Sequence, residues 1–319
     1  MPTVGTEQEA SYLRRALELA ERGRGTTRPN PVVGAVVVRD GKVVGEGWHE
    51  RAGGPHAEVV ALEQAGPAAR GATLYVSLEP CSTEGRTPPC TEAIVSAGIG
   101  RVVAGAPDPV QDGIGRLREA GVEVEVVDSW EARVQNEAWR TWAALGRPFV
   151  TYKAATTLDG RVTVPGSRWV TGEESRRLVH ELRAGSDAVG VGMGTVRADD
   201  PALTARDVGA ARQPRRLAFG RGPLPEGSQL ELRSGSLDEE LRRLGEEEVQ
   251  SLLLEGGPTL ATAFLEADLI DKLLVFVAPR LSGEGPRLFG DPTRSVQLLR
   301  LFARPIGADV LLAAYVHEP

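Results

Sequence analysis

The stretch L-E-P-C-S-T-E-G-R-T-P-P-C, at residues 78–90, contains both cysteines of the 319-residue chain. Cys81 and Cys90 each follow a proline directly, and His56-Ala57-Glu58 precedes them. One imidazole and two thiolates form a donor set that suits Zn²⁺, and three protein ligands leave a fourth position open for water. We therefore predict that His56, Cys81 and Cys90 bind one zinc ion, with Glu58 as the catalytic general acid and base.

This pattern also has plainer interpretations. The tripeptide H-x-E is common, two cysteines can simply be buried thiols, and a zinc ion bound here could serve only to stabilise the fold. The order His, Glu, Pro-Cys, Cys favours a nucleobase deaminase, whose general signature is H-x-E followed by P-C-x-x-C. In this chain eight residues separate the cysteines instead of two.

The residues around the motif alternate between strand and helix patterns. Asp40-Gly41 separates two valine-rich runs, which predicts a β-hairpin. Helical patterns cover 7–22, 56–65, 90–97, 117–120 and 131–145, and strand patterns cover 72–78, 101–105 and 122–127. Gly146-Arg147-Pro148 then stops the last helix. We therefore predict an α/β sandwich over residues 1–146.

The remaining residues, 147–319, predict a second α/β domain. Strand patterns cover 149–155, 187–192, 251–254, 272–278 and 310–316, and helical patterns cover 173–184, 237–248 and 258–266. The run E-G-G-P at 255–258 leads from a strand into a helix. Its glycines let a ligand approach the backbone, and a helix start favours phosphate.

Composition and charge exclude several classes of protein. The chain has 37 basic and 44 acidic residues, a net charge of −7, which argues against a nucleic-acid partner. No stretch approaches 18 consecutive apolar residues, so we expect no membrane span. Two cysteines make no disulfide framework, and the N-terminus lacks the layout of a secretion signal, so we expect a cytoplasmic protein.

The first half resembles the deaminase half of bifunctional riboflavin biosynthesis proteins. The resemblance rests on P-N-P-V-V-G at 29–34, G-G-P-H-A-E-V at 53–59 and the stretch at 78–90. It implies a cytidine-deaminase-like α/β/α sandwich that removes the 2-amino group of a diaminopyrimidinone carrying a ribosylamino 5-phosphate. It also implies that Asn30 binds the pyrimidine and that Arg86 contacts the substrate at its phosphate.

The second half resembles the reductase half of the same proteins. The motifs are K-A-A-T-T-L-D-G-R at 153–161, S-R-W-V-T-G at 167–172, L-R-A-G-S-D-A-V-G-V-G at 182–192, G-T-V-R-A-D-D-P-A-L-T-A-R at 194–206 and L-E-G-G-P-T-L-A at 254–261. They imply a dihydrofolate-reductase-like fold that uses NADPH to reduce the ribosyl group to ribityl. Implied NADPH contacts are Thr156, Trp169, Thr195, Asp199, Gly257, Pro258, Thr259, Leu260, Ala261, Thr262 and Ala263. Implied substrate contacts are Lys153, Ser167, Arg183, Leu203, Arg206 and Glu255.

The chain departs from the family pattern at three places. Thr83 stands where the family usually has histidine, the segment 108–115 is about four residues shorter, and A-F-G-R occupies 218–221 in place of an L-D-S-type motif. Two alternatives therefore stay open: that only one half is active, with the deaminase retained, or that the zinc domain acts on another nucleobase such as cytidine or tRNA adenosine. By resemblance we also expect a homo-oligomer.

Overall fold

The computed structural model describes residues 6–85 and 88–319, and the chain divides into two compact units, Met1–Ala144 and Leu145–Pro319. Both units are α/β, as the sequence predicts. Within the described residues, no helix has the length and apolar character needed to cross a membrane.

The first unit is built on a five-stranded sheet in the order β2-β1-β3-β4-β5. Its strands are β1 (Gly34–Arg39), β2 (Lys42–Trp48), β3 (Thr73–Val76), β4 (Arg101–Ala104) and β5 (Glu123–Val126). β1 pairs antiparallel with β2 and β3, while β3, β4 and β5 are parallel. The predicted hairpin is confirmed: Asp40 and Gly41 join β1 to β2 with φ values of 50° and 73°, as a two-residue type I′ turn requires.

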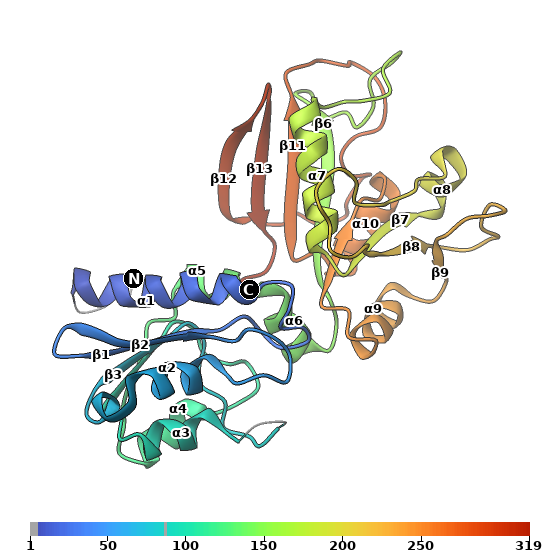
Figure 1. Ribbon diagram of the computed structural model, residues 1–319. Coiled ribbons are helices and arrows are strands. Elements are labelled where there is room, and N and C mark those ends of the chain that lie inside the picture. Colours follow the sequence, from blue (N-terminus) through green and yellow to red (C-terminus); the bar gives the residue numbers. More distant parts are fainter. Residues whose placement is uncertain (1–5, 86–87) are drawn as a thin grey trace. The chain divides into compact units, whose positions relative to one another are not determined.

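Helices cover both faces of this sheet (Figure 1). They are α1 (Glu7–Ala20), α2 (Ala57–Ala65), α3 (Cys90–Ser96), α4 (Gly113–Glu119), α5 (Trp130–Gln135) and α6 (Glu137–Leu145), with short 3₁₀ turns at Glu21–Gly23 and Gly66–Ala69. On one face α2, α3 and α4 pack against alternate strand residues such as Leu74 and Val102. On the other face α1 packs against Val36 and Tyr75. The result is the expected α/β/α sandwich.

The single helix predicted over 131–145 is in fact two helices. Asn136 interrupts it with φ −118° and ψ 24°. Its side chain accepts a hydrogen bond from the Val32 N–H (3.0 Å) and donates one to the Val32 carbonyl (2.9 Å). The Asn136 N–H still donates to the Arg133 carbonyl (3.2 Å), so the side-chain contact to Val32 is an additional, tertiary interaction at the break. Helical periodicity alone contains no sign of it.

The second unit contains an eight-stranded sheet in the order β12-β13-β11-β6-β10-β7-β8-β9. The strands are β6 (Phe149–Thr157), β7 (Ala188–Gly192), β8 (Arg215–Phe219), β9 (Glu231–Arg233), β10 (Ser251–Leu254), β11 (Lys272–Ala278), β12 (Leu299–Ile306) and β13 (Asp309–Tyr315). The strands from β11 to β9 in that order are parallel, and β13 pairs antiparallel with both β11 and β12.

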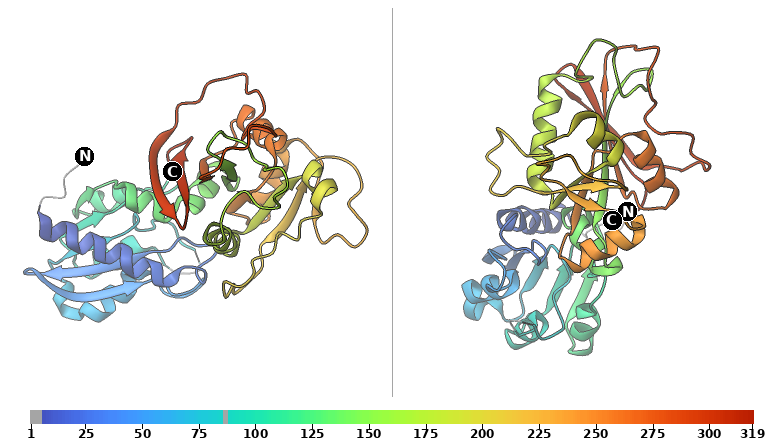
Figure 2. Two further views of the ribbon diagram at one scale, coloured as in Figure 1. Left: turned by 90° about the horizontal axis from the view of Figure 1, so that it is seen from above. Right: turned by 90° about the vertical axis from the view of Figure 1, so that its right-hand side faces the viewer.

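Helices again lie on both faces of the sheet. They are α7 (Glu173–Gly185), α8 (Met193–Asp199), α9 (Leu237–Glu246) and α10 (Pro258–Glu266). Figure 2 shows α7 and α10 on opposite sides of the strands. α9 and α10 pack Leu241, Leu244 and Phe264 against one face, while α7 and α8 cover the other. This is the dihydrofolate-reductase-like arrangement expected from the sequence.

Four elements of this unit were missing from the sequence-based prediction: α8, β8, β9 and β12. β9 has three residues and α8 has seven, so each is too short for a periodic pattern. β12 lies at the sheet edge, and the side chains from Arg300 to Pro305 are exposed. Without a buried face, its sequence has no alternation of apolar and polar residues to recognise.

Candidate active sites

The three predicted zinc ligands lie together in the first unit. The ligand atoms of His56, Cys81 and Cys90 all fall within 4.8 Å of one another. His56 Nδ1 is 3.1 Å from Cys90 Sγ and 3.5 Å from Cys81 Sγ, and the Cys90 N–H donates to Cys81 Sγ at 3.2 Å. One nitrogen and two sulfurs at this spacing fit the ligand set of a zinc ion with one open position.

Helix α2 brings Glu58 to this cluster. His56 is the N-cap of α2 and Glu58 lies in its first turn. α2 can pack close to β2 because residue 47 is glycine. A Cβ at Gly47 would fall 2.4 Å from the Ala57 carbonyl oxygen, which is too close for any other residue. The Glu58 side chain is 3% exposed, and this burial raises the pKa of its carboxyl group to about 7. A carboxyl group with such a pKa can both accept and donate a proton near neutral pH.

Asn30 lies beside a histidine that sequence reasoning did not single out. Asn30 Nδ2 is 3.1 Å from His49 Nε2, and His49 Nδ1 is 3.0 Å from the Pro55 carbonyl oxygen. The His49 and His56 rings meet edge to face, with centroids 5.2 Å apart. Burial lowers the pKa of His49, which favours a neutral ring that donates to Pro55 and accepts from Asn30. The other predicted contact, Arg86, lies outside the described residues.

The second unit has a cavity of about 700 Å³ at the carboxyl ends of β7 and β10. This volume is typical of sites for small molecules and cofactors, and such sites usually occur at this edge of a parallel sheet. Gly257 forms part of the wall, and a Cβ there would lie 3.7 Å from Thr195 Oγ1. This is an ordinary van der Waals distance, so Gly257 and Thr195 line neighbouring parts of the cavity wall.

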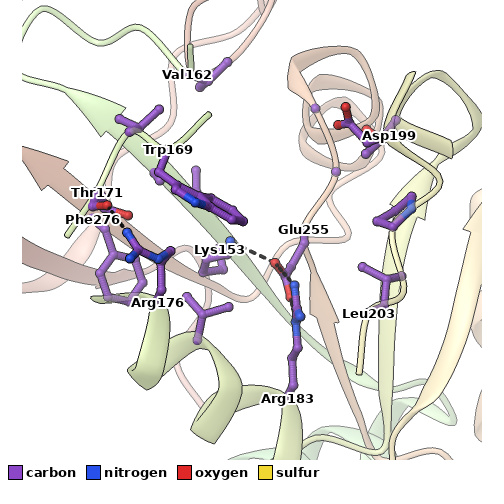
Figure 3. A pocket seen from close by; sticks show the side chains of 18 of the residues that line it. Lys153, Val162, Trp169, Thr171, Arg176, Arg183, Asp199, Leu203, Glu255 and Phe276 are labelled. Carbon is purple, nitrogen blue, oxygen red and sulfur yellow. Dashed lines mark hydrogen bonds and ion pairs between the residues drawn. The ribbon is translucent and has the colours of Figure 1, made fainter. Parts of the chain in front are cut away.

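A buried carboxylate held by two cations lies at the centre of the cavity (Figure 3). Glu255 is 2.9 Å from Lys153 Nζ and receives two hydrogen bonds from Arg183, at 2.6 and 3.0 Å. Its side chain is 7% exposed. Burial by itself raises the pKa of the Glu255 carboxyl, but Lys153 and Arg183 outweigh it and lower that pKa to about 2. Glu255 is therefore ionised at neutral pH and orients both cations.

Most of the residues predicted for the second site line this cavity. They are Lys153, Trp169, Arg183, Thr195, Asp199, Leu203, Arg206, Glu255, Gly257 and Pro258. Thr156 is buried in β6, Thr259 to Ala263 continue α10 behind Pro258, and Ser167 donates to the Trp169 carbonyl at 2.8 Å. None of these seven residues is among those that line the cavity within the described part of the chain.

Arg183 and Arg206, which the sequence grouped together, have different environments. Arg183 is engaged by Glu255 and by the Thr204 carbonyl, at 3.1 Å. Arg206 is exposed, and among the described residues no carboxylate lies within 4.0 Å of its guanidinium group. Its backbone N–H donates to His180 Nδ1 at 3.2 Å. Arg206 is therefore the better placed of the two to bind an anion.

Sequence reasoning missed two polar cavity residues on α7, Arg176 and His180. Arg176 donates to the Thr171 carbonyl at 2.7 Å and lies 5.2 Å from the centroid of the Trp169 ring, which is half exposed. A signal for both residues was present. Arg176, His180 and Arg183 follow the i, i+4, i+7 spacing of a helix face, so identifying Arg183 points to the other two.

Both units match known protein families. Residues 6–106 match the cytidine and deoxycytidylate deaminase zinc-binding region, and residues 148–312 match the RibD C-terminal domain. These two families imply a zinc-binding deaminase and a reductase that uses a nicotinamide cofactor.

Relatives match nearly the whole chain. The riboflavin biosynthesis protein RibD of Aquifex aeolicus is 44% identical over 91% of this chain and 92% of its own, and that of Escherichia coli is 41% identical over 88% and 90%. Among solved structures, Acinetobacter baumannii RibD has a TM-score of 0.83 at 36% identity, covering 97% of this chain and 99% of its own. A diaminohydroxyphosphoribosylaminopyrimidine deaminase/5-amino-6-(5-phosphoribosylamino)uracil reductase from Thermotoga maritima has a TM-score of 0.80 at 34% identity, covering 96% and 97%. The chain belongs to the RibD family of riboflavin biosynthesis proteins, which join a deaminase to a reductase.

Proposed function

We propose that residues 1–146 deaminate 2,5-diamino-6-(5-phosphoribosylamino)pyrimidin-4-one and that residues 147–319 reduce the ribosyl side chain of the product to ribityl with NADPH. The product of both steps is 5-amino-6-(5-phosphoribitylamino)uracil. The observation that carries the proposal is the cluster of His56, Cys81 and Cys90 beside the buried Glu58, in one chain with the cavity around Glu255. Incubation with the pyrimidine, with and without NADPH, followed by product analysis, tests it directly.

In the deaminase step the protein positions the base and moves protons. His56, Cys81 and Cys90 would hold one zinc ion per chain, which would make hydroxide available at neutral pH. The Glu58 carboxyl group carries protons to the ring nitrogen and the leaving amine. Asn30, whose amide is oriented by His49, pairs with the edge of the pyrimidine, and Arg86 contacts the substrate phosphate.

In the reductase step the protein supplies position and charge. NADPH supplies the hydride. Lys153 and Arg183, both held by Glu255, face the reacting part of the cavity, while Arg206 binds the sugar phosphate. Leu203 borders the substrate, and Ser167 supports this site through its hydrogen bond to the Trp169 carbonyl. Trp169, Thr195, Asp199, Gly257 and Pro258 form the cofactor side, which Thr156 and the helical residues Thr259 to Ala263 support from outside the cavity lining.

Replacing Arg206 should separate the two activities. Arg206→Ala removes the guanidinium group and keeps the backbone contact to His180. Because a charge-assisted hydrogen bond contributes about 1.5–3 kcal/mol, we expect the KM for the substrate of the reductase to rise roughly 10- to 150-fold, with ammonia release unchanged. Both half-reactions are measured on one preparation.

Arg177→Ala is the matched control, because Arg177 lies on α7 and its side chain is 75% exposed. It should leave both activities unchanged. A parallel loss of both activities in Arg206→Ala would point to misfolding or a shared site. An unaffected reductase would show that Arg206 is a surface charge only.

We further propose that the protein works as a cytoplasmic homo-oligomer. β12 lies at the edge of the eight-stranded sheet and exposes Leu301 and Phe302, which supports an interface between copies. The assignment of both cysteines to zinc supports a reducing compartment. Light scattering coupled to size-exclusion chromatography measures the oligomeric state.

A further inference from the structure

The zinc ligand Cys81 lies in a segment that is bound on both sides by the stretch of chain after β4. Cys81 follows β3, and β4 is followed by a loop at residues 105–112 that leads into the first turn of α4 at Gly113 and Ile114. Because β3 and β4 are parallel neighbours, the chain leaves both strands at the same edge of the sheet. Before Cys81, the Glu79 carboxylate accepts hydrogen bonds from the Asp108 N–H (2.8 Å) and the Ile114 N–H (2.9 Å).

The first turn of α4 also approaches Pro80 closely. A Cβ at Gly113 would lie 1.9 Å from the Pro80 carbonyl oxygen, so only glycine allows this contact. Glu79 is 5% exposed. The segment that enters Cys81 is therefore held by buried hydrogen bonds and by direct backbone packing.

After Cys81, whose carbonyl accepts the Thr91 N–H at 3.2 Å, the side chain of Gln111 holds the described part of the chain. Gln111 Oε1 accepts hydrogen bonds from the Ser82 N–H (3.0 Å), the Thr83 N–H (3.3 Å) and the Thr83 hydroxyl (2.9 Å). The Gln111 side chain is itself oriented by Asp108, whose Oδ2 is 3.4 Å from Gln111 Nε2. Asp108 Oδ1 also accepts the backbone N–H groups of Val110 and Gln111, at 2.8 and 3.1 Å.

These contacts connect two of the three departures from the family pattern. Thr83 is one departure, and the shortened segment 108–115, which contains Gln111, is another. The sequence presents them as unrelated changes about 28 positions apart, whereas in the structure one carboxamide joins them. The shortened loop thus still reaches the chain that follows Cys81.

We propose that Gln111 is a positioning residue of the deaminase: it fixes the backbone at Ser82 and Thr83, and thereby holds Cys81 as a zinc ligand. The inference rests on the proposed function of this unit. Partners that orient a metal ligand contribute about 10- to 100-fold to metal affinity or activity. If the segment after Cys81 were flexible, Cys81 Sγ would dissociate from the zinc ion more often, because the position of Sγ depends on the backbone on both sides of Cys81.

The test measures zinc release to a chromogenic chelator, with kcat and KM for ammonia release measured separately on the full-length zinc-loaded protein. Gln111→Ala should speed zinc release about 10- to 100-fold and lower kcat/KM for ammonia release by a similar factor. Thr83→Ala removes one of the three accepted hydrogen bonds and should change both by about two- to tenfold. NADPH-dependent reduction in the same sample should not change and reports on an intact second unit, while circular dichroism compares the overall helix and strand content of the variants with that of the wild type.

Two further variants separate positioning from general stability. Asp112→Ala removes the N-cap of α4, where Asp112 Oδ1 accepts the Gly115 N–H at 2.8 Å, without touching Ser82 or Thr83. It should leave zinc release unchanged. Gln111→Glu alone places its new carboxylate beside that of Asp108, and the two repel each other. In Gln111→Glu combined with Asp108→Asn, the new amide at 108 donates a hydrogen bond to the new carboxylate at 111. That double variant keeps the acceptor for Ser82 and Thr83 and should restore zinc release to within about threefold of the wild type.

The outcomes distinguish this inference from the proposed function. Wild-type protein without near-stoichiometric zinc would contradict the proposed function. A zinc-loaded wild type with Gln111→Ala equal to Asp112→Ala in zinc release would overturn the role of Gln111 alone. A double variant as impaired as Gln111→Ala would also overturn it, since the acceptor oxygen is restored there.

Discussion

Glu58→Gln should lower the rate of ammonia release by about 10² to 10⁴-fold while zinc remains bound. Glutamine keeps the size of the side chain and its hydrogen-bonding atoms but cannot take up or deliver a proton. Glu58 is buried in the first turn of α2, two residues after His56, so no bulk water can easily replace it. Initial rates of ammonia release and zinc content by elemental analysis check this result.

Two further variants serve as controls for this experiment. Glu63→Gln changes an exposed glutamate on the same helix and should leave ammonia release unchanged. Cys81→Ser combined with Cys90→Ser should lose the metal together with the activity. Near-wild-type ammonia release by Glu58→Gln would remove Glu58 from the proton-transfer role, and near-stoichiometric zinc in the cysteine variant would refute the ligand assignment.

Glu255→Gln should lower the free energy of unfolding of the second unit by about 3 kcal/mol and NADPH-dependent reduction by about 10²-fold. The substitution leaves Lys153 and Arg183 without their shared carboxylate in a largely buried site. The same two side chains then lose their fixed positions in the cavity, and small displacements of binding groups are costly to catalysis. Hydrogen exchange at the backbone amides of residues 147–319 reports on the stability of this unit, and NADPH oxidation reports on its activity.

The control for this variant is another buried ion pair of the same unit. Arg147 donates to both oxygens of Asp271, at 2.8 and 2.9 Å, and neither residue lines the described cavity. Asp271→Asn should therefore destabilise the unit while leaving reduction per folded molecule unchanged. If Glu255→Gln and Asp271→Asn reduced activity equally per folded molecule, Glu255 would have a structural role only.

The acid stability of the second unit should depend on Glu255. Its pKa is about 2 in the folded protein and near its ordinary value of 4.5 when unfolded. The contribution of this group to stability is therefore complete above about pH 4.5 and is lost as the pH falls through about 2. It amounts to about 3 kcal/mol. The wild type should lose more stability over this pH range than Glu255→Gln, as urea unfolding at several pH values would show.

Where a residue pattern is local and regular, the sequence alone predicted the structure. The strands Ser251–Leu254 and Lys272–Ala278 and the helix Pro258–Glu266 have the predicted limits, since their buried faces leave a periodic signal. The hairpin at Asp40-Gly41 is of the same kind, because the turn geometry depends on those two residues alone. The sequence also singled out His56, Cys81 and Cys90, since cysteine and histidine are rare in this chain and zinc needs those atoms.

Only the tertiary structure decided which side chains act on one another across distant parts of the chain. At the break between α5 and α6, the Asn136 side chain forms hydrogen bonds with both backbone groups of Val32, and Arg183 is paired with Glu255, 72 positions away. His49 meets Asn30, and Gln111 meets Thr83, through loops brought together at the edge of a sheet. Such contacts depend on side-chain hydrogen bonds between separate elements, which leave no periodicity in either segment. The sequence by itself therefore determined the metal-binding atoms and the two folds. The side-chain packing within each unit determined which polar side chains are paired, which are oriented by a neighbour, and which are left to bind a ligand.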